Sequence, residues 1–531
     1  MRTLTIGPLS TLFFKYLLSV LLLAGLFNNV AVAATTPTGI AWHEAANDAD
    51  ISRAFAQAKT DSKPVLLYWG ATWCPPCNKL KATLFNRQDF ILQTRAVVAV
   101  HVDGDLPSAQ KLGTRFKVTG YPMMILMNAN GTEITRLPGE VESAQIIAAL
   151  NLALAGGRPA KALLADVRAN KTLTANEWRT LAYYSWETDD AQLMSADERP
   201  QMLADLAQAS TSADAMIATR LWLKAVVASD GHPNIKGLPS MDARRKTLVE
   251  LLADPVKVHQ HLDVLVNYAA ELSRQTSAAN TPERTELLAA YNAALLGLQN
   301  DVTLARADQV DALAARVELA RLDQPETAVQ ISLPEVLQQE LRSSSARLDR
   351  DITNGYERQA VIPTIAFVLG RAGLWQASDD LLKSSLSKSI SPYYLMSSLG
   401  SNAKKQGRND EAVAWYGKAW ATSKGPATRL QWGASYIIAL VDLAPDKTTQ
   451  ITATASQIFA EAGKDGSAFH QRSARSLSRI ADKLATWNTA DAHKAELTKI
   501  TAQIDKLCKR LPEKDPQKAS CVDVLAKASK T

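Results

Sequence analysis

The chain has 531 residues, a length that predicts two or more domains rather than one. Its hydrophobic content of 47% and charged content of 21% are typical of globular proteins, which excludes a disordered or membrane-packed chain. The net charge is +6, and no basic stripe carries interleaved aromatic residues, so nucleic acid is not expected among the partners.

The first 33 residues have the pattern of a secretory signal peptide. Arg2 and Lys15 supply positive charge, the stretch 16–27 is almost entirely apolar, and Ala-Val-Ala at 31–33 provides the small residues that a signal peptidase needs. The apolar stretch is shorter than the ~20 residues of a membrane-spanning helix, although an uncleaved membrane anchor stays the alternative. We therefore predict that residues 1–33 are removed on export and that the protein is located in the periplasm.

Residues 38–155 alternate between helical and strand patterns. Asn47 or Asp48 can cap a helix that extends to Thr60, and apolar runs at 65–69 and 96–102 suit buried strands. A helix from Lys79 to Leu84 is expected between those strands. The final elements are two strand-like runs at 123–127 and 132–136, which predict a hairpin around Asn-Ala-Asn-Gly at 128–131, and a helix at 143–154. Strands joined by helices predict an α/β layer fold.

Residues 158–531 have the composition and spacing of helices almost throughout. Part of this region repeats: Gly373 and Gly407 are 34 residues apart, and the stretch 407–416 is similar to a tetratricopeptide helix pair. Neighbouring helix pairs bury, by stacking, the hydrophobic surface that one pair alone would leave exposed. We predict a large all-α domain with tetratricopeptide-like repeats around 365–426, and a generic helical domain is the alternative.

Aromatic residues gather in the same region. The expected role of this cluster is packing between helix pairs, and a peptide-binding groove is the alternative. Its members are Tyr393, Tyr394, Trp415, Tyr416 and Trp420.

The four cysteines fall into two close pairs, Cys74/Cys77 and Cys508/Cys521. An even number of cysteines in an exported protein predicts disulfide chemistry. Cys508 and Cys521 flank a proline-containing turn at 511–516 between two expected helices, so a helical hairpin can bring their sulfurs together. We predict a structural disulfide there, and an electron-shuttling second pair is the alternative.

The run Trp73-Cys74-Pro75-Pro76-Cys77 lies directly after a buried strand and at the start of a helix. Unpaired helix amides favour negative charge at that place, so a thiolate of Cys74 can attack a disulfide. Cys77 lies one turn inward, where it can resolve the mixed disulfide. A zinc site of this spacing needs a second ligand pair, and the other two cysteines are near the opposite end of the chain, so no metal is expected.

On this motif and the surrounding segment, residues 38–155 resemble the thioredoxin superfamily, in particular the exported members related to the thioredoxin-like domain of membrane disulfide reductases. The resemblance implies a thioredoxin fold, a redox-active Cys74/Cys77 pair and no cofactor. It also implies that Tyr121-Pro122 is the family's cis-proline, with Pro122 facing the dithiol as part of the catalytic centre, whereas an ordinary strand-entry proline is the alternative. The residues expected to contact substrate are Trp73, Pro75, Pro76 and Tyr121.

The sequence departs from the thioredoxin pattern at several positions. Tyr68 stands where thioredoxins carry a buried aspartate, and Ala99 stands at the accompanying lysine, so the aid to proton transfer is missing or supplied from elsewhere. Met123 replaces the usual threonine after the cis-proline. No histidine lies between the cysteines, which favours a reduction potential nearer the ~−270 mV of thioredoxin than the ~−120 mV of a strong oxidant.

We therefore expect an exported thiol–disulfide oxidoreductase that reduces or exchanges disulfides of envelope proteins, with the helical domain docking the substrate or an electron donor in the membrane. The alternative is a helical-repeat scaffold or binding protein of the envelope with an ancillary thioredoxin domain. The presence of both motif cysteines favours the enzyme, because a scaffold has no need of an oxidation-prone thiol. A thiol peroxidase is disfavoured, because Ala71 occupies the position of the threonine that such enzymes place before the reactive cysteine.

Overall fold

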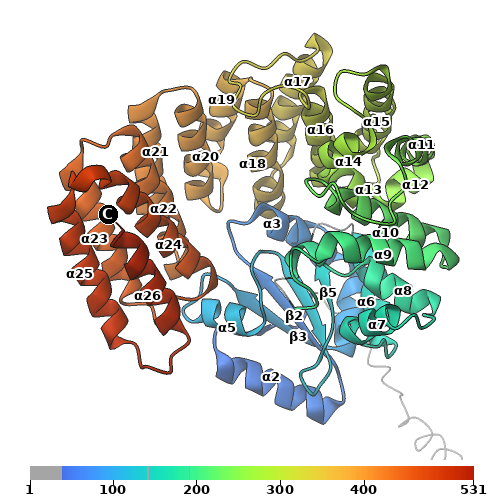
Figure 1. Cartoon of the computed structure of the whole chain (residues 1–531), viewed down its shortest axis with the longest axis horizontal. Coiled ribbons are helices and arrows are strands. Elements are labelled where there is room, and N and C mark those ends of the chain that lie inside the picture. The colour runs from blue at the N-terminus through green and yellow to red at the C-terminus, as the bar shows by residue number, and fades with distance from the viewer. Residues whose placement is uncertain (1–38, 140–142, 190–191, 531) are drawn as a thin grey trace, which may run out of the picture. The chain divides into compact units, whose positions relative to one another are not determined.

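The first part of the chain is a five-stranded sheet with helices on both faces (Figure 1). A computed structural model describes residues 39–139, 143–189 and 192–530. The strands are β1 (His43–Glu44), β2 (Val65–Gly70), β3 (Val98–Asp103), β4 (Met123–Met127) and β5 (Glu133–Pro138). The helices are α2 (Asp48–Asp61), α3 (Pro75–Ala82), α4 (Gln88–Gln93), α5 (Ala109–Arg115) and α6 (Ser143–Leu154). The sheet order is β1-β3-β2-β4-β5, in which β1, β3 and β2 are parallel and β4 is antiparallel to its neighbours. The predicted α/β layer fold is confirmed.

Local sequence explains where these elements begin and turn. Helix α2 starts at a capping box: the Asn47 side chain accepts from the backbone N–H of Asp50, and the Asp50 carboxylate accepts from the backbone N–H of Asn47. In the β4–β5 hairpin the Asn128 side chain accepts from the backbone N–H of Thr132 at 2.9 Å. Gly131 adopts a φ of +85°, which suits a residue without a side chain.

Some element boundaries, and one strand, differ from the sequence-based expectation. Strand β3 begins at Val98 rather than at residue 96, because residues 94–96 form a 3₁₀ turn. Helix α3 ends at Ala82, where the chain enters another 3₁₀ turn and the Asn86 side chain donates to the Lys81 carbonyl at 2.9 Å. The two-residue strand β1 is too short to give a periodic signal.

Side chains alternate between the two faces of the central strand β2. Leu66 and Tyr68 pack with side chains of α3 and α6, whereas Val65, Leu67 and Trp69 pack with α2 and α5. This period of two is what a strand buried on both faces requires.

The described chain after β5 is built from α-helices and short 3₁₀ turns, so the predicted all-helical region is confirmed; its tetratricopeptide character stays a prediction. No helix of the described residues combines the length and the hydrophobicity that crossing a membrane would take. The predicted signal peptide lies outside the described residues. The helices are α7 (Ala160–Arg168), α8 (Ala175–Ala182), α9 (Arg199–Ala209), α10 (Ala215–Ala228), α11 (Met241–Leu252), α12 (Pro255–Gln260), α13 (Leu262–Asn267), α14 (Ala269–Thr276), α15 (Pro282–Asn300), α16 (Arg306–Ala320), α17 (Glu335–Asp351), α18 (Gly355–Arg371), α19 (Trp375–Ser385), α20 (Pro392–Lys405), α21 (Asn409–Thr422), α22 (Pro426–Leu443), α23 (Thr448–Ala462), α24 (Gln471–Trp487), α25 (Lys494–Arg510) and α26 (Gln517–Ala528).

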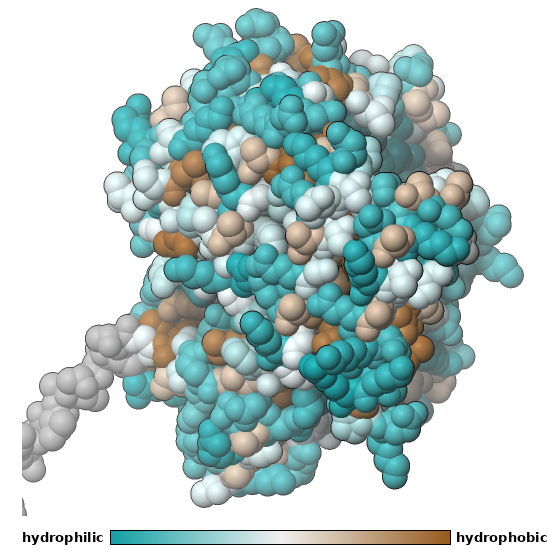
Figure 2. Space-filling view, turned by 90° about the vertical axis from the view of Figure 1, so that its left-hand side faces the viewer, coloured by the Kyte–Doolittle hydropathy of each residue, from teal (hydrophilic) through white to brown (hydrophobic). Residues whose placement is uncertain are grey.

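Small residues let successive helices approach closely. A Cβ atom added at Gly400 of α20 would lie 3.0 Å from the ring of Tyr416 on α21. Tyr416 therefore packs between two helices, as expected for the aromatic cluster. On the face of the molecule in Figure 2, polar residues predominate and hydrophobic ones occur in small separate groups, as expected where helices turn their apolar sides inward.

The sheet and the first helices of the helical region share one hydrophobic core. Leu66 of β2 belongs to the same buried cluster as Leu163 of α7, Trp178 of α8 and Leu221 of α10. The described chain from Gly39 onward accordingly forms one compact unit.

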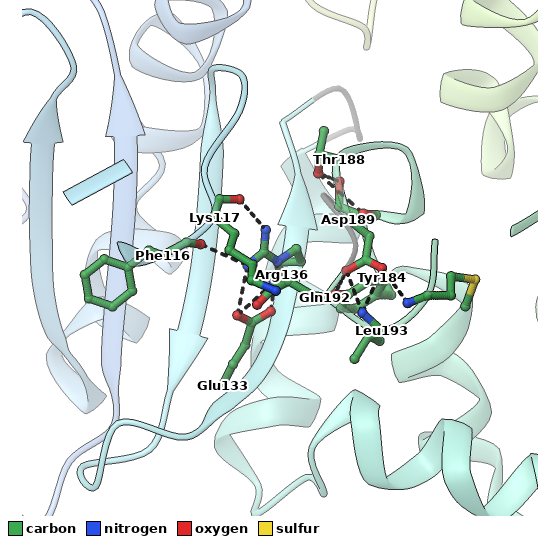
Figure 3. A network of polar contacts seen from close by, with 11 residues as sticks. Phe116, Lys117, Glu133, Arg136, Tyr184, Thr188, Asp189, Gln192 and Leu193 are labelled. Carbon is green, nitrogen blue, oxygen red and sulfur yellow. Dashed lines mark hydrogen bonds and ion pairs between the residues drawn. The ribbon is translucent and has the colours of Figure 1, made fainter. Parts of the chain in front are cut away.

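A polar network covers the edge strand β5 at this junction (Figure 3). The buried Arg136 side chain donates to the Glu133 carboxylate at 2.8 and 2.9 Å and to the backbone carbonyl of Lys117 at 3.1 Å. The Arg136 carbonyl accepts from the backbone N–H of Ser185, in the turn after α8. An edge strand otherwise exposes unpaired backbone groups, so the bond from Ser185 joins the sheet to the helical region.

Candidate functional site

Cys74 and Cys77 lie where β2 leads into α3. Cys74 is the N-cap residue of that helix, Pro75 and Pro76 fill its first two positions, and the Cys74 Sγ accepts from the backbone N–H of Cys77 at 3.2 Å. Proline is well suited to the first helical turn, because the N–H it lacks would have no partner there. The two sulfurs form a disulfide with a Cα–Cα distance of 5.3 Å. The geometry thus places one sulfur at the positive end of the helix dipole, where a thiolate is stabilised on reduction.

The Tyr121–Pro122 peptide bond faces this disulfide and is cis. The Tyr121 carbonyl oxygen lies 3.7 Å from the Cys74 Sγ. Opposite Pro122 stands Gly139, where an added Cβ would lie 2.1 Å from the proline Cγ, so only glycine leaves room for the ring. The structure therefore brings together the two motif cysteines and the predicted cis-proline, which are remote in sequence.

The position of the thioredoxin aspartate is occupied by a buried phenol. Tyr68 is 1% exposed, and its hydroxyl has no hydrogen-bond partner among the described residues. Burial, together with the nearby Asp103 carboxylate, raises the pKa of Tyr68 well above its usual value. Ala99 is buried in the same apolar cluster, so neither position of the thioredoxin aspartate–lysine pair carries a charged residue.

Trp73, expected to form part of the substrate platform, contacts the helical region. Its ring stacks on Tyr394 of α20 with centroids 6.1 Å apart and meets the edge of Trp432 of α22 at 5.3 Å. The guanidinium of Arg472 on α24 lies 5.1 Å from the centre of the Trp73 ring, and the Gln359 side chain of α18 donates to the Trp73 carbonyl at 2.9 Å. Sequence reasoning did not find these neighbours, because no local pattern links residues so distant along the chain.

An acidic residue after β3 connects these groups. The Asp105 carboxylate accepts from the Trp73 indole N–H at 2.9 Å and forms an ion pair with Arg472. The same carboxylate accepts from the hydroxyl of Thr428 on α22. Arg472 also lies 5.5 Å from the ring centre of Tyr121. One arginine of the helical region thus contacts both sides of the expected substrate platform.

A second ionic contact lies on α3 itself. The ammonium group of Lys79 is 2.5 Å from Asp308 and 3.3 Å from Asp311, both on α16. Burial alone would lower the pKa of Lys79, but the two carboxylates outweigh it and the pKa is raised. Helix α18 packs on α3 beside this contact (Figure 1). The helix that carries the cysteines is therefore held on its outer side by the helical region.

As a result, the dithiol is almost inaccessible. Cys74 is 3% exposed and Cys77 is 0% exposed. The cavity beside Pro75 and Pro76 is small, about 140 Å³, and helical-region residues such as Asp311 line its other side. Since one water takes ~30 Å³ of liquid, this space holds only a few waters and no peptide segment.

Cys508 and Cys521 form a disulfide between α25 and α26, with a Cα–Cα distance of 5.5 Å. Both are buried in the core of the last helices, whereas Cys74 and Cys77 form a separate small cluster with Ala71.

Among residues 39–139, 143–189 and 192–530, no group of three or more His, Cys, Asp or Glu side chains is arranged to hold a metal ion.

The fold and this site define a thioredoxin-like domain that carries a redox-capable cysteine pair. Comparison with known proteins agrees: residues 51–154 match the family model of a thioredoxin-like domain. This chain thus contains a thioredoxin-like domain, as the motif predicts.

Two curated relatives and one solved structure resemble the same segment. The chain is 32% identical over 121 residues to "Thiol:disulfide interchange protein DsbD 2" of Pseudomonas aeruginosa, a match that covers 21% of this chain and 20% of that protein. It is 28% identical over 99 residues to "Disulfide bond reductase DsbH" of Chlamydia pneumoniae, a match that covers 16% of this chain and 58% of that protein. A thioredoxin from Thermus thermophilus is similar at 22% identity over 22% of this chain and 87% of that one, with a TM-score of 0.20. The chain therefore spans only a part of the curated relatives it matches.

Proposed function

We propose that the protein is an exported thiol–disulfide oxidoreductase that reduces or exchanges disulfides of envelope proteins through Cys74 and Cys77. The observation that carries this proposal is the Cys74–Cys77 disulfide at the start of α3, facing the cis Tyr121–Pro122 bond. The names of two relatives, an interchange protein and a disulfide bond reductase, support the same chemistry. The signal-like first 33 residues support export to the periplasm.

The reaction moves two electrons from the reduced pair to a substrate. The Cys74 thiolate attacks one sulfur of the substrate disulfide, that S–S bond breaks, and the leaving sulfur takes up a proton. The Cys77 thiol then gives up its proton and attacks the Cys74 sulfur, which releases the second substrate thiol and leaves the Cys74–Cys77 disulfide. A dithiol donor must reduce this disulfide again, and we assign its docking, or that of the substrate, to the helical domain 158–531.

Turnover with two disulfides tests the proposal. The protein should accelerate the reduction of a small aromatic disulfide and of insulin by dithiothreitol. Cys74→Ser should abolish both reactions, because it removes the nucleophile. Cys77→Ser should instead accumulate a mixed disulfide on Cys74, detectable as a mass increase that dithiothreitol reverses.

One observation favours the scaffold alternative. The dithiol is buried under the helical region, as expected if the helices were the functional part and the cysteines only structural. In that case neither disulfide would be reduced in a cysteine-dependent manner, and Cys74→Ser would behave like the parent protein.

A further inference from the structure

The helical region occupies the surface that the proposed reaction needs. Tyr394 and Trp432 cover the ring of Trp73, the residue that precedes the nucleophile. Arg472 lies over both Trp73 and Tyr121, whose backbone is expected to pair with a substrate. A polypeptide that approaches the Cys74 sulfur along this platform meets these three side chains first.

Hydrogen bonds and an ion pair orient two of these side chains, Arg472 and Trp432. Arg472 is held by the Asp105 carboxylate, and the backbone N–H of Arg472 donates to the Gln110 side chain at 3.0 Å. Gln110 donates in turn to the Tyr121 hydroxyl at 2.9 Å. Trp432 is itself oriented, because its indole N–H donates to the Tyr393 carbonyl at 3.1 Å. Directional bonds as well as apolar contacts therefore hold the covering side chains over the platform.

On the basis of the function proposed above, we propose that Tyr394, Trp432 and Arg472 determine which substrates reach Cys74. With these side chains in place, the dithiol exchanges only with small thiols and disulfides. A disulfide within a protein reacts once the three side chains have moved away from Trp73 and Tyr121. The helical region thus selects substrates by size and couples their access to its own displacement.

The burial of the sulfur supports selection by size. Cys74 is 3% exposed, and the two residues packed against the cysteine pair, Trp73 and Tyr121, are in contact with the covering side chains of the helical region. A small thiol needs only a slight displacement of these side chains, whereas a peptide strand must displace them entirely.

Alkylation with two reagents of different size tests the inference. In the Cys77→Ser background Cys74 is a free thiol and the Cys508–Cys521 disulfide stays intact, so no reductant is needed. N-ethylmaleimide and a maleimide carrying a long polyethylene glycol chain are compared by peptide mass spectrometry, with free cysteine as the reference for intrinsic reactivity. The large reagent can react only with open molecules, in which the three side chains have moved away from Trp73 and Tyr121. Its rate relative to free cysteine should therefore be at least about tenfold lower than that of N-ethylmaleimide.

Variants that remove one of the covering side chains should cancel the difference in rate between the two maleimides. Trp432→Ala and Tyr394→Ala should each raise the rate of the large reagent several-fold toward that of the small one, and Tyr394→Ala serves if the more buried Trp432→Ala does not fold. Trp415→Ala, which removes an indole from α21 that does not contact Trp73, is the matched control and should change neither rate.

The outcomes separate this inference from the proposed function. Equal relative rates for both reagents in the Cys77→Ser protein would overturn the size selection and leave the thiol chemistry standing. A Cys74 that reacts with neither reagent, even in the Tyr394→Ala and Trp432→Ala variants, would overturn the proposed function itself.

Discussion

Removing the charge of Lys79 should open the site without touching a cysteine. In Lys79→Met the carboxylates of Asp308 and Asp311 remain between α16 and α3 with no counter-charge. Breaking a buried pair by removing one partner costs about 3–5 kcal/mol, and we take the lower end because the Asp311 side chain is 33% exposed. Since ~1.4 kcal/mol corresponds to a factor of ten, the open population should rise about 100-fold.

The assay is the alkylation of Cys74 by the polyethylene glycol maleimide in the Cys77→Ser background. Lys79→Met should raise this rate by about two orders of magnitude, up to the limit set by N-ethylmaleimide. Adding Asp308→Asn and Asp311→Asn should restore slow labelling, because neutral amides need no counter-charge. Lys111→Met is the matched control: its partner Asp48 is on the exposed surface, where an ion pair is worth only ~0–1 kcal/mol. If Lys79→Met is labelled as slowly as its parent and unfolds at the same temperature, the ionic contact does not hold α3 closed.

Three further predictions concern stability. In the background of Cys74→Ser and Cys77→Ser, replacing Cys508 and Cys521 together by alanine should lower the free energy of unfolding by ~3 kcal/mol, because the disulfide closes a short loop, and the urea midpoint should become insensitive to reductant; an unchanged midpoint would argue against this stabilisation. Arg220→Met should cost ~3–5 kcal/mol and lower the melting temperature, because it leaves the buried Asp263 carboxylate, now 2.6 Å from the guanidinium, without its direct ion-pair partner. His261 is buried, and burial together with the positive charge of Arg220 lowers its pKa to about 4. The His261 imidazole therefore takes up a proton less readily in the folded state than in the unfolded state. Its contribution to stability is fully present above pH ~6.5 and is lost as the pH falls toward 4. Between pH 7 and pH 5 that loss is about 2 kcal/mol, and His261→Gln should remove it, as calorimetry at the two pH values would show; an equally steep pH dependence in the variant would assign the effect to other groups.

The sequence by itself determined features encoded over a few residues. Asn47 and Asp50 specify the start of α2, and the Asn-Ala-Asn-Gly run specifies the β4–β5 hairpin, because each depends on side chains that bond their own backbone neighbours. The place of the cysteine motif after a buried strand follows in the same way from a short apolar run. The all-helical character of the second region is likewise legible from composition and spacing.

Sequence could not say what covers the motif. Tyr394 belongs to an aromatic cluster predicted to pack between helices, and Tyr416 of that cluster does so against Gly400. Tyr394, however, stacks on Trp73, and Lys79 finds its partner in Asp308. Helical periodicity shows that a side chain is buried but not against which distant element, because that choice depends on the packing of the whole chain. Tertiary structure alone therefore decided that the dithiol is enclosed by helices encoded hundreds of residues away.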